Sequence, residues 1–334
     1  MPGAQIASNF ESLMAKVESS YGVDPTPGAT DGVSLRGPMT TSIDRMIIER
    51  ALVSHVESRR AHGVINDRIT FSFTCAVGGI KQADGGYPGV HPFKVGGGYA
   101  ATLAGTEAGG DLTATYAPTT SGKGSYAMYR HLINRTNGQQ VLLKMLGCRS
   151  NFEYVVGINA ELLMNVSGAC LYAEWEPVAA LTDPTSWGQG IASLMCDNVT
   201  HTFNGTARRI TAWNFATNYA LGSEDAVQGA TTAQEITLHR PAGTPLGGSI
   251  NPVALATDFA ASSSLVAESR DATEGIHILS FNDGVSNFTY NAPKAQIGNL
   301  PLVDDQAFKR FNTPYYNNYD SAGDDENSFV FGEE

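Results

Sequence analysis

The sequence has few charged residues and no long apolar run, and each shortage excludes a class of protein. Charged residues make up 16% of the 334-residue chain, and its formal net charge is −12. Because phosphate binding requires Lys and Arg, this balance argues against a protein that wraps nucleic acid. A channel through which DNA slides remains compatible, since weak repulsion prevents sticking there. No run of about 18 apolar residues occurs, so no membrane-spanning helix is expected.

Cysteine is also scarce. The four cysteines, Cys75, Cys148, Cys170 and Cys196, lie far apart and form no C-x-x-C pair. We expect reduced, mostly buried thiols, because free cysteine is a common small core residue. Such thiols suit assembly in a reducing cytoplasm. The amino terminus shows neither the basic nor the apolar region of a secretion signal.

Glycine, by contrast, is abundant at 36 residues, and Thr, Asn and Ser are frequent. This composition favours an all-β fold, with one or two short helices, that gives much of its surface to neighbours. A chain of this length exceeds the usual size of one core, so we expect one large or two moderate domains.

Residues 1–35 are predicted to form a helix and an arm. Apolar residues fall at helical spacing between positions 5 and 18. That helix would dock either on its own core or on a neighbouring subunit. The run Asp24-Pro-Thr-Pro27 cannot be helical, because each proline fixes φ and lacks an N–H. We therefore expect an extended arm that enters a first strand near Val33–Arg36.

Two similar series of elements follow. Alternating β-branched and aromatic residues predict strands, and the first series also contains a possible helix. Its strands are Arg68–Cys75, Leu112–Tyr116, Tyr126–Leu132, Gln140–Leu146, Ser150–Tyr154, Ile158–Val166 and Ala169–Glu174, with the helix near 93–102. The second comprises Glu235–Leu238, a helix at 252–262, Gly275–Phe281, Ser286–Tyr290 and a closing pair of strands within Lys294–Phe311.

The motif Ser-Asn-Phe-x-Tyr occurs in both series, at Ser150 and at Ser286. We therefore predict two modules, joined by a Pro- and Gly-rich linker. The expected boundaries are module 1 at 36–178 with an inserted Gly-rich stretch at 96–124, a linker at 179–195, module 2 at 196–312 and an acidic carboxyl-terminal tail at 313–334.

Several segments carry a resemblance to a known family. They are Thr115–Ser121, the Asn137-Gly138 turn, Leu146–Phe152 and Val166–Tyr172, and they come after the arm and strand described above. In order and overall length, though in no single diagnostic motif, the chain resembles the tail tube proteins (major tail proteins) of long-tailed bacteriophages. The acidic segment Tyr319–Glu334 departs from that family's pattern.

The resemblance implies a structural virion protein and no enzyme, cofactor or metal. Tail tube subunits are β-sandwich or half-barrel modules whose sheets pair with those of neighbours into an inner β-barrel, which removes exposed sheet edges. Rings of six modules stack into a tube that carries genome DNA into the host without binding it specifically. Two modules per chain imply a trimer with pseudo-sixfold symmetry, and a single module would imply a hexamer. Further implied partners are the tape-measure protein and the tail terminator and distal tail proteins, with assembly in the host cytoplasm.

The candidate contact residues follow from this picture. They lie in the arm, in a mildly basic stretch at Arg45–His62 and among tyrosines beside the acidic tail, because tyrosine is favoured at interfaces. The basic stretch is predicted to be either a hairpin that meets an acidic face of the next ring or an ordinary surface segment. The candidates are Pro25, Pro27, Arg45, Arg50, Arg59, Arg60, Tyr315, Tyr316 and Tyr319.

Motifs for chemistry are weak. Gly96–Ala101 and Ser121–Ser125 lack the contexts of nucleotide-binding loops. No histidine pair has metal-ligand spacing, and His277 alternates with isoleucines, so it is predicted to face outward. Two other functions are kept as alternatives. One is a β-sandwich capsid decoration or receptor-binding protein, and the other is a hydrolase with a dispersed active site.

Overall fold

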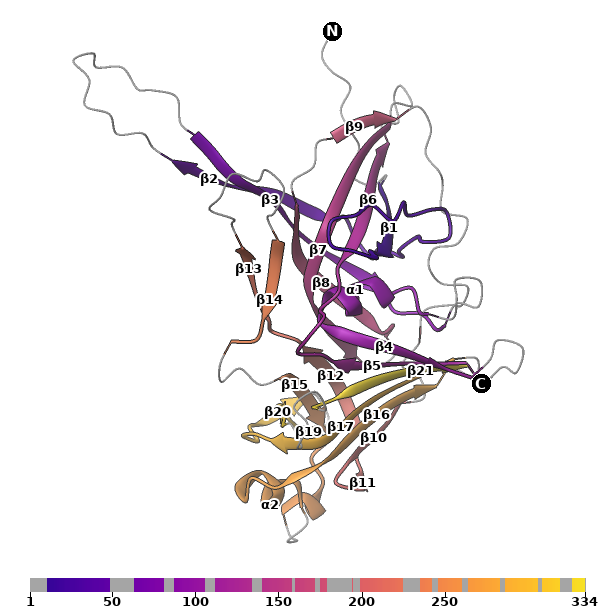
Figure 1. Cartoon of the computed structure of the whole chain (residues 1–334). Helices are drawn as coiled ribbons and strands as arrows, with labels where there is room; N and C mark the ends of the chain where they lie inside the picture. Colours follow the sequence, from indigo (N-terminus) through magenta and orange to yellow (C-terminus); the bar gives the residue numbers. More distant parts are fainter. Residues whose placement is uncertain are drawn as a thin grey trace, which may run out of the picture.

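The structure is a computed structural model in which part of the chain is placed well enough to describe. The described residues are 11–48, 63–80, 87–105, 112–133, 140–157, 160–171, 175–178, 194, 199–224, 235–241, 246–259, 264–282, 286–305, 308–318 and 326–333. Within these ranges the chain is mostly β-strand with two short α-helices, which confirms the all-β class (Figure 1).

The amino-terminal half contains nine strands and one helix in its described ranges. They are β1 (Glu11–Val17), β2 (Thr40–Ile48), β3 (Gly63–Ala76), α1 (His91–Gly96), β4 (Tyr99–Ala104), β5 (Thr113–Pro118), β6 (Tyr126–Ile133), β7 (Gln140–Gly157), β8 (Leu163–Leu171) and β9 (Trp175–Val178).

The carboxyl-terminal half contains the remaining elements. They are β10 (Val199–Phe203), β11 (Thr206–Ala207), β12 (Ile210–Ala216), β13 (Ala220–Glu224), β14 (Glu235–His239), β15 (Leu246–Pro252), the 3-10 helix η3 (Ala256–Phe259), α2 (Leu265–Arg270), β16 (Glu274–Asn282), β17 (Ser286–Ile297), β18 (Leu302–Asp305), β19 (Phe308–Phe311), β20 (Thr313–Asn317) and β21 (Ser328–Glu333).

The strands of the two halves pair in the same order. In the first half β1, β6, β7 and β9 are neighbours in that order, and so are β2, β3, β8 and β7. In the second half the same places are taken by β10, β16, β17 and β21, and by β12, β15, β20 and β17. We call these strands the first set and the second set. All of these pairings are antiparallel, so the halves share a connectivity as well as a strand content.

One ladder joins the two sets. Residues 153–157 of β7 pair with residues 216–212 of β12, on the edge of β7 that β8 leaves free. The strands therefore run without a break in the order β2, β3, β8, β7, β12, β15, β20 and β17. In Figure 1 the first set lies above the second, and the β2–β3 hairpin extends to one side of the body.

A second connection comes from the last strand. β21 pairs with β17 of its own set and with β5 of the first half. Its Phe329 lies at the centre of an aromatic cluster drawn from both sets. Ring centroids of Tyr154 and Phe215 lie 5.2 and 5.1 Å from that of Phe329, and those of Phe288 and Tyr290 lie 6.0 and 5.6 Å away. Aromatic pairs at such separations add to area burial, so β21 fastens the two halves together.

The expected amino-terminal helix is wrong where the structure describes it. Residues 11–17 form strand β1, which pairs with β6 along its whole length. Leu13 and Ala15 enter the main core, while Met14 packs on the opposite face with Tyr129 and Leu142. Because both faces of this strand are buried, its apolar residues show no alternation and imitate helical spacing. β1 docks on its own chain, which was one of the two alternatives.

Other element boundaries also differ from expectation. β7 is one strand where two were predicted, because Gly147 with φ +62 lets it bend from one sheet into the next. The expected strand at 33–36 makes only isolated bridges, and the predicted strand at 158–166 begins only at Leu163. The first helix ends at Gly96, and the described part of the predicted helix at 252–262, residues 252–259, contains η3 and no α-helix. In the predicted glycine loop, β4 begins at Tyr99.

The second series was also aligned wrongly. β15, and not the predicted Glu235–Leu238, takes the place of β3, because β14 belongs to an added hairpin with β13. Ser150 pairs within the carboxyl-terminal half of β7, whereas Ser286 begins β17, so the two copies of the motif are not equivalent. The expected tail at 313–334 contributes β20 and β21, so its described residues belong to the sheet. The linker at 179–195 lies almost wholly outside the described residues.

Candidate functional site

The long row of strands has one apolar and one polar face. In β3, Phe71, Phe73 and Cys75 point into the core, while Ser72 and Thr74 between them face outward. The same alternation occurs in β8, β7 and β12, as expected when successive side chains point to opposite sides of a sheet. The outward face is thus built largely from Ser, Thr and Asn.

The strand register aligns these outward residues in a row. Each member is the direct cross-strand neighbour of the next, so the row crosses the sheet from the first set into the second. It runs through Thr74, Asn165, Glu153, Ala216, Gly247, Tyr316 and Gln296.

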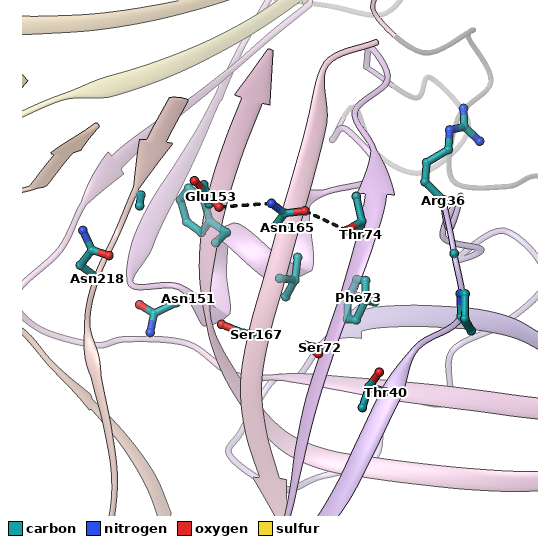
Figure 2. Close-up of a pocket in the computed structure, with 15 residues that line it drawn as sticks. Arg36, Thr40, Ser72, Phe73, Thr74, Asn151, Glu153, Asn165, Ser167 and Asn218 are labelled. Carbon is teal, nitrogen blue, oxygen red and sulfur yellow. Dashed lines mark hydrogen bonds between the residues drawn. The ribbon is translucent and has the colours of Figure 1, made fainter. Parts of the chain in front are cut away.

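Hydrogen bonds connect the side chains along this face. Thr74 donates its hydroxyl to Asn165 Oδ1 at 2.8 Å, and Asn165 Nδ2 donates to one oxygen of Glu153 at 3.1 Å (Figure 2). The other oxygen of Glu153 accepts from Asn214 Nδ2 at 3.2 Å. Asn214 Oδ1 in turn accepts from the Ser249 hydroxyl at 3.0 Å. We call these five residues the polar ladder. Because they satisfy one another, they are held flat on the sheet and do not extend from it.

The amino-terminal part of this face forms a shallow open depression of about 580 Å³. Residues from β2, β3, β8, β7 and β12 line it, and its polar side chains appear in Figure 2. Among the lining residues, Glu153 is the only carboxylate and Arg36 the only cation. Arg36 lies at the rim and pairs with Glu161, Nε to Oε2, at 2.6 Å. The surface therefore offers many short neutral dipoles and little net charge.

Two successive glycines of β15 allow the neighbouring strands to approach closely. A Cβ on Gly248 would lie 1.9 Å from the backbone oxygen of Asn214, and one on Gly247 would lie 2.2 Å from that of Tyr315. Any side chain at these positions would push the neighbouring strands of the sheet apart. β15 thus lets β12 and β20 pack closely on both of its edges.

The proline candidates pack against their own chain. Pro27 is buried and Pro25 half-buried, in a segment held by its own hydrogen bonds. Asp24 of this segment accepts a hydrogen bond from the Tyr129 hydroxyl, and Tyr21 OH accepts one from the backbone N–H of Ile236 at 2.7 Å.

The basic and tyrosine candidates fall in different places. The backbone of Arg45 lies in β2, while the Arg45 side chain and all of Arg50, Arg59, Arg60 and Tyr319 lie outside the described residues. Tyr315 is fully buried and donates to the backbone oxygen of Asn214 at 2.9 Å, so in this fold it offers no surface for contact. Tyr316 is 39% exposed and belongs to the polar face. Among the candidates that the structure describes, Pro25 and Pro27 lie in the arm, whereas Tyr315 and Tyr316 are successive residues of β20.

Buried titratable groups lie behind the sheet. The amine of Lys94 has no hydrogen-bond partner and lies 4.0 Å from the ring centre of Phe329 and 4.3 Å from that of Tyr116. Burial lowers its pKa well below the usual range. His91, one turn earlier, stacks on Tyr87 and contacts the Tyr116 hydroxyl through Nδ1 at 2.9 Å. Burial, and then the charge of Lys94, lower the pKa of His91 to about 4.

The second set contains a buried histidine pair. The rings of His201 and His277 meet edge to face with centroids 4.9 Å apart, and none of their nitrogens has a hydrogen-bond partner. The predicted outward orientation of His277 is wrong, because β10, β17 and β20 cover that side of β16. Burial, and then nearby Arg208, lower the pKa of His201 to about 3. Burial also lowers the pKa of His277.

Sequence reasoning missed the polar ladder, although alternation in β3 and β8 indicated that one face was polar. A shift of one residue in register moves every side chain to the other face, so the row could not be assembled without the fold. Within the described ranges, no group of three or more His, Cys, Asp or Glu residues could hold a metal ion.

No helix in the described part of the chain is long and apolar enough to cross a membrane. Comparison with known proteins gives no relative: no protein-family model and no curated protein matches the chain.

Proposed function

We propose that this chain is a structural tail tube protein of a long-tailed bacteriophage or a related particle, with two modules that polymerise into stacked rings. The observation that carries the proposal is the repeated pairing of the two sets of strands, which gives one continuous row of strands with a polar face. A repeated module inside one chain is the geometry that lets three chains build a ring of six places.

The junction between the sets suggests how one chain meets the next. Inside the chain, β12 of the second set lies on the free edge of β7 of the first set. The equivalents of these strands are β2 and β17. Among the described residues β2 pairs only with β3. β16 covers the other edge of β17 as far as Gln296, so Ile297 is the residue of the β17–β20 ladder with a partner in β20 alone. Placing β2 of one copy beside the end of β17 in the next repeats the junction and closes the ring without a free edge.

Burial supports this placement. Ile43 of β2 lies opposite Ile69 of β3, whose side chain points into the core, yet Ile43 is 46% exposed. The corresponding core-facing residues of β12, Trp213 and Phe215, are buried because β7 and its set lie beside them. A neighbouring strand paired with the open edge of β2 would bury this side chain.

The polar face would then line the lumen. Its side chains are short and hydrogen-bonded to one another, and the depression carries one carboxylate and one ion-paired cation. Such a surface offers DNA few phosphate-binding groups, so DNA can slide without being held. The tape-measure, terminator and distal tail proteins remain partners implied by the resemblance alone.

Negative-stain electron microscopy at rising protein concentration tests the proposal. We expect tubes or stacked rings of one diameter, with threefold averaging that reveals six similar modules. Sixfold symmetry with six chains in each ring would contradict the two-module ring. Discrete closed particles at every concentration would favour a capsid decoration or receptor-binding protein.

A pair of variants tests the edge. Ile43→Lys places a charge on the open edge of β2 and should abolish tubes while the chain stays folded. Ile276→Lys is the matched control, because Ile276 is 51% exposed on β16, a strand with neighbours on both edges. If Ile43→Lys assembles as the native chain does, β2 is not the ring-closing edge, even where native tubes support the general function.

A further inference from the structure

Two of the buried cysteines are cross-strand neighbours. The antiparallel β7–β8 ladder ends with Arg149 opposite Ala169, and Cys148 and Cys170 are the next residue of each strand, so the register extended by one step places them opposite each other. Residues that face each other across two strands have side chains on the same side of the sheet. Both thiols are fully buried in the main core, and neither is in a disulfide. The sequence alone separates them by a hairpin and gives no sign of this pairing.

The two thiols also interact directly. The Cys170 thiol lies close enough to Cys148 to raise the pKa of the Cys148 thiol, and the Cys148 sulfur lies 3.4 Å from the backbone oxygen of Met145, Sγ to O. The third described cysteine, Cys75, lies on β3 opposite Met164, with its sulfur 3.6 Å from the Met164 oxygen. Cys75 therefore lies opposite a methionine and not opposite Cys148 or Cys170.

The backbone geometry suits a covalent bond. Directly opposed residues of an antiparallel pair have Cα atoms about 4.5–5.5 Å apart. This lies inside the range of roughly 4.4–6.8 Å that disulfides span. The site also lies where Gly147, with φ +62, turns β7 from one sheet into the other. A bond here would fix the point at which the two sheets of the first set meet.

We propose that Cys148 and Cys170 form an intramolecular cross-strand disulfide when the chain meets a disulfide oxidant such as oxidised glutathione. This inference does not depend on the proposed function. One thiolate attacks a sulfur of the oxidant and releases one glutathione thiolate. The second cysteine thiolate then attacks the mixed disulfide and releases the other. The two cysteine protons end on the two glutathione molecules, so the oxidant is reduced by the electrons that the cysteines lose.

The environment makes this reaction slow in the native chain. Burial, followed by the Cys170 thiol, raises the pKa of Cys148, so little reactive thiolate is present. Reaction therefore requires local opening of the strand pair. Once formed, the bond closes the β7–β8 hairpin and restricts the unfolded chain, which raises the urea concentration needed for unfolding.

The experiment incubates the full chain with oxidised glutathione, both folded and during refolding from urea. Thiols are then counted after denaturation, and peptides are mapped by mass spectrometry without reduction. We expect the four cysteines of the chain to give four free thiols before oxidation and two after it. One linked peptide pair should contain Cys148 and Cys170 and lack the mass of two hydrogen atoms. The urea midpoint should rise and return to its original value with dithiothreitol.

Matched variants identify the pair. Cys148→Ala and Cys170→Ala should each remove the linked peptide and the rise in midpoint, whereas Cys75→Ala should keep both. Four free thiols after both oxidation routes would overturn the proposal. A linked peptide that contains Cys75 or Cys196, or a glutathione adduct at Cys148 that never closes, would also overturn it. The peptide map of the oxidised native chain identifies the disulfide by itself. The test therefore remains valid even if an alanine variant folds poorly.

Discussion

β7 and β17 occupy the same place in their sets, yet their surroundings differ at one edge. β7 has β8 on one side of its carboxyl-terminal half and β12 on the other, so this half lies inside the sheet. At the corresponding end of β17, β20 lies on one side and β16 covers the other only as far as Gln296, so Ile297 pairs with β20 alone. The comparison teaches that the same place in a repeated set has a neighbouring strand from the other set in one half and none from it in the other half.

The two sets also differ in what they add to the shared pairings. The first half carries the β4–β5 hairpin, and the second carries the β13–β14 hairpin. Both additions fold back on the other half. β5 pairs with β21, and the backbone oxygen of Ile236 in β14 accepts from Arg149 of β7 at 2.6 Å. Both added hairpins thus hold the two halves together. We therefore expect the loss of core packing between the halves to have the largest effect on stability.

The largest effect is expected where the two sets meet in the core. Phe329→Ala removes the ring that packs on aromatic residues from both sets, so it should lower the free energy of unfolding by about 3–5 kcal/mol. Urea unfolding followed by tryptophan fluorescence measures this loss. Val330→Ala is the control, because the neighbouring Val330 faces the other side of β21 and is half-buried. A loss below about 1 kcal/mol for Phe329→Ala would show that each half is stable without the shared cluster.

A smaller effect is expected from acid, and it should begin in the second set. The folded-state pKa of His201 is about 3 and that of His277 is also lowered, whereas both lie near 6.5 in the unfolded chain. The stability linked to these neutral rings is therefore complete above pH 6.5 and is lost as the pH falls below it. At pH 5 the buried ring of His201 should cost about 2 kcal/mol of stability, and the ring of His277 should add to that loss.

Urea midpoints at pH 7 and pH 5 measure this loss. His277→Phe should reduce the difference, because a phenyl ring suits the surrounding Phe203, Tyr290 and Tyr315 and does not titrate. His239→Ala is the control, since His239 is exposed. An unchanged acid dependence in His277→Phe would show that the buried ring of His277 does not contribute to it.

A gain in stability is expected at the buried amine of the first half. Lys94→Met keeps the length of the side chain and removes an amine that has no hydrogen-bond partner. Because the pKa of Lys94 is lowered in the fold, the cost of holding it neutral grows as the pH falls below about 10.4. The variant should therefore be more stable than the native chain by about 1–3 kcal/mol at pH 7, and by less at pH 10.

Urea midpoints at both pH values test this expectation. Lys16→Met, at a side chain that is 48% exposed beside Asp31, should change little. A loss of stability in Lys94→Met would mean that the amine and its five surrounding rings attract each other by more than the cost of burial.

Sequence patterns predicted the class of fold because alternation is a local property. Arg68–Cys75, Tyr126–Leu132 and Gly275–Phe281 all lie in the strands that their patterns indicated. Alternation failed at β1, where both faces are buried, and at His277, where a second layer covers the side that a lone strand would expose to water. Both failures come from tertiary contacts that no local pattern contains.

The candidate site required long-range information throughout. Thr74 and Asn165 are 91 positions apart, and Asn214 and Glu153 are 61 apart, and each pair meets only through the strand order. The repeated Ser-Asn-Phe-x-Tyr motif, which suggested two modules, does not occupy equivalent places in the two halves. The order in which the strands pair is nevertheless the same in both. Connectivity can outlast sequence similarity, because backbone ladders tolerate many side chains whereas a five-residue motif does not.

The smallest effect is expected on the polar ladder, where the two sets join. Glu153 accepts hydrogen bonds from Asn165 in the first set and from Asn214 in the second. Glu153→Gln leaves one oxygen to serve two amide donors, so it should lower the free energy of unfolding by about 1 kcal/mol. Glu161→Gln is the matched control, because the partly exposed ion pair with Arg36 should contribute less.

A double-mutant cycle with Asn214→Ala separates the ladder from the simple loss of a charge. If the ladder couples the sets, the two substitutions together should cost less than the sum of each alone, by about 0.5 kcal/mol or more. Additive losses would mean that backbone pairing between β7 and β12 joins the two sets without help from the polar ladder. In that case a second copy could pair with β17 and β2 without any matching polar ladder, and the specificity of assembly would have to come from the shape of the edges alone.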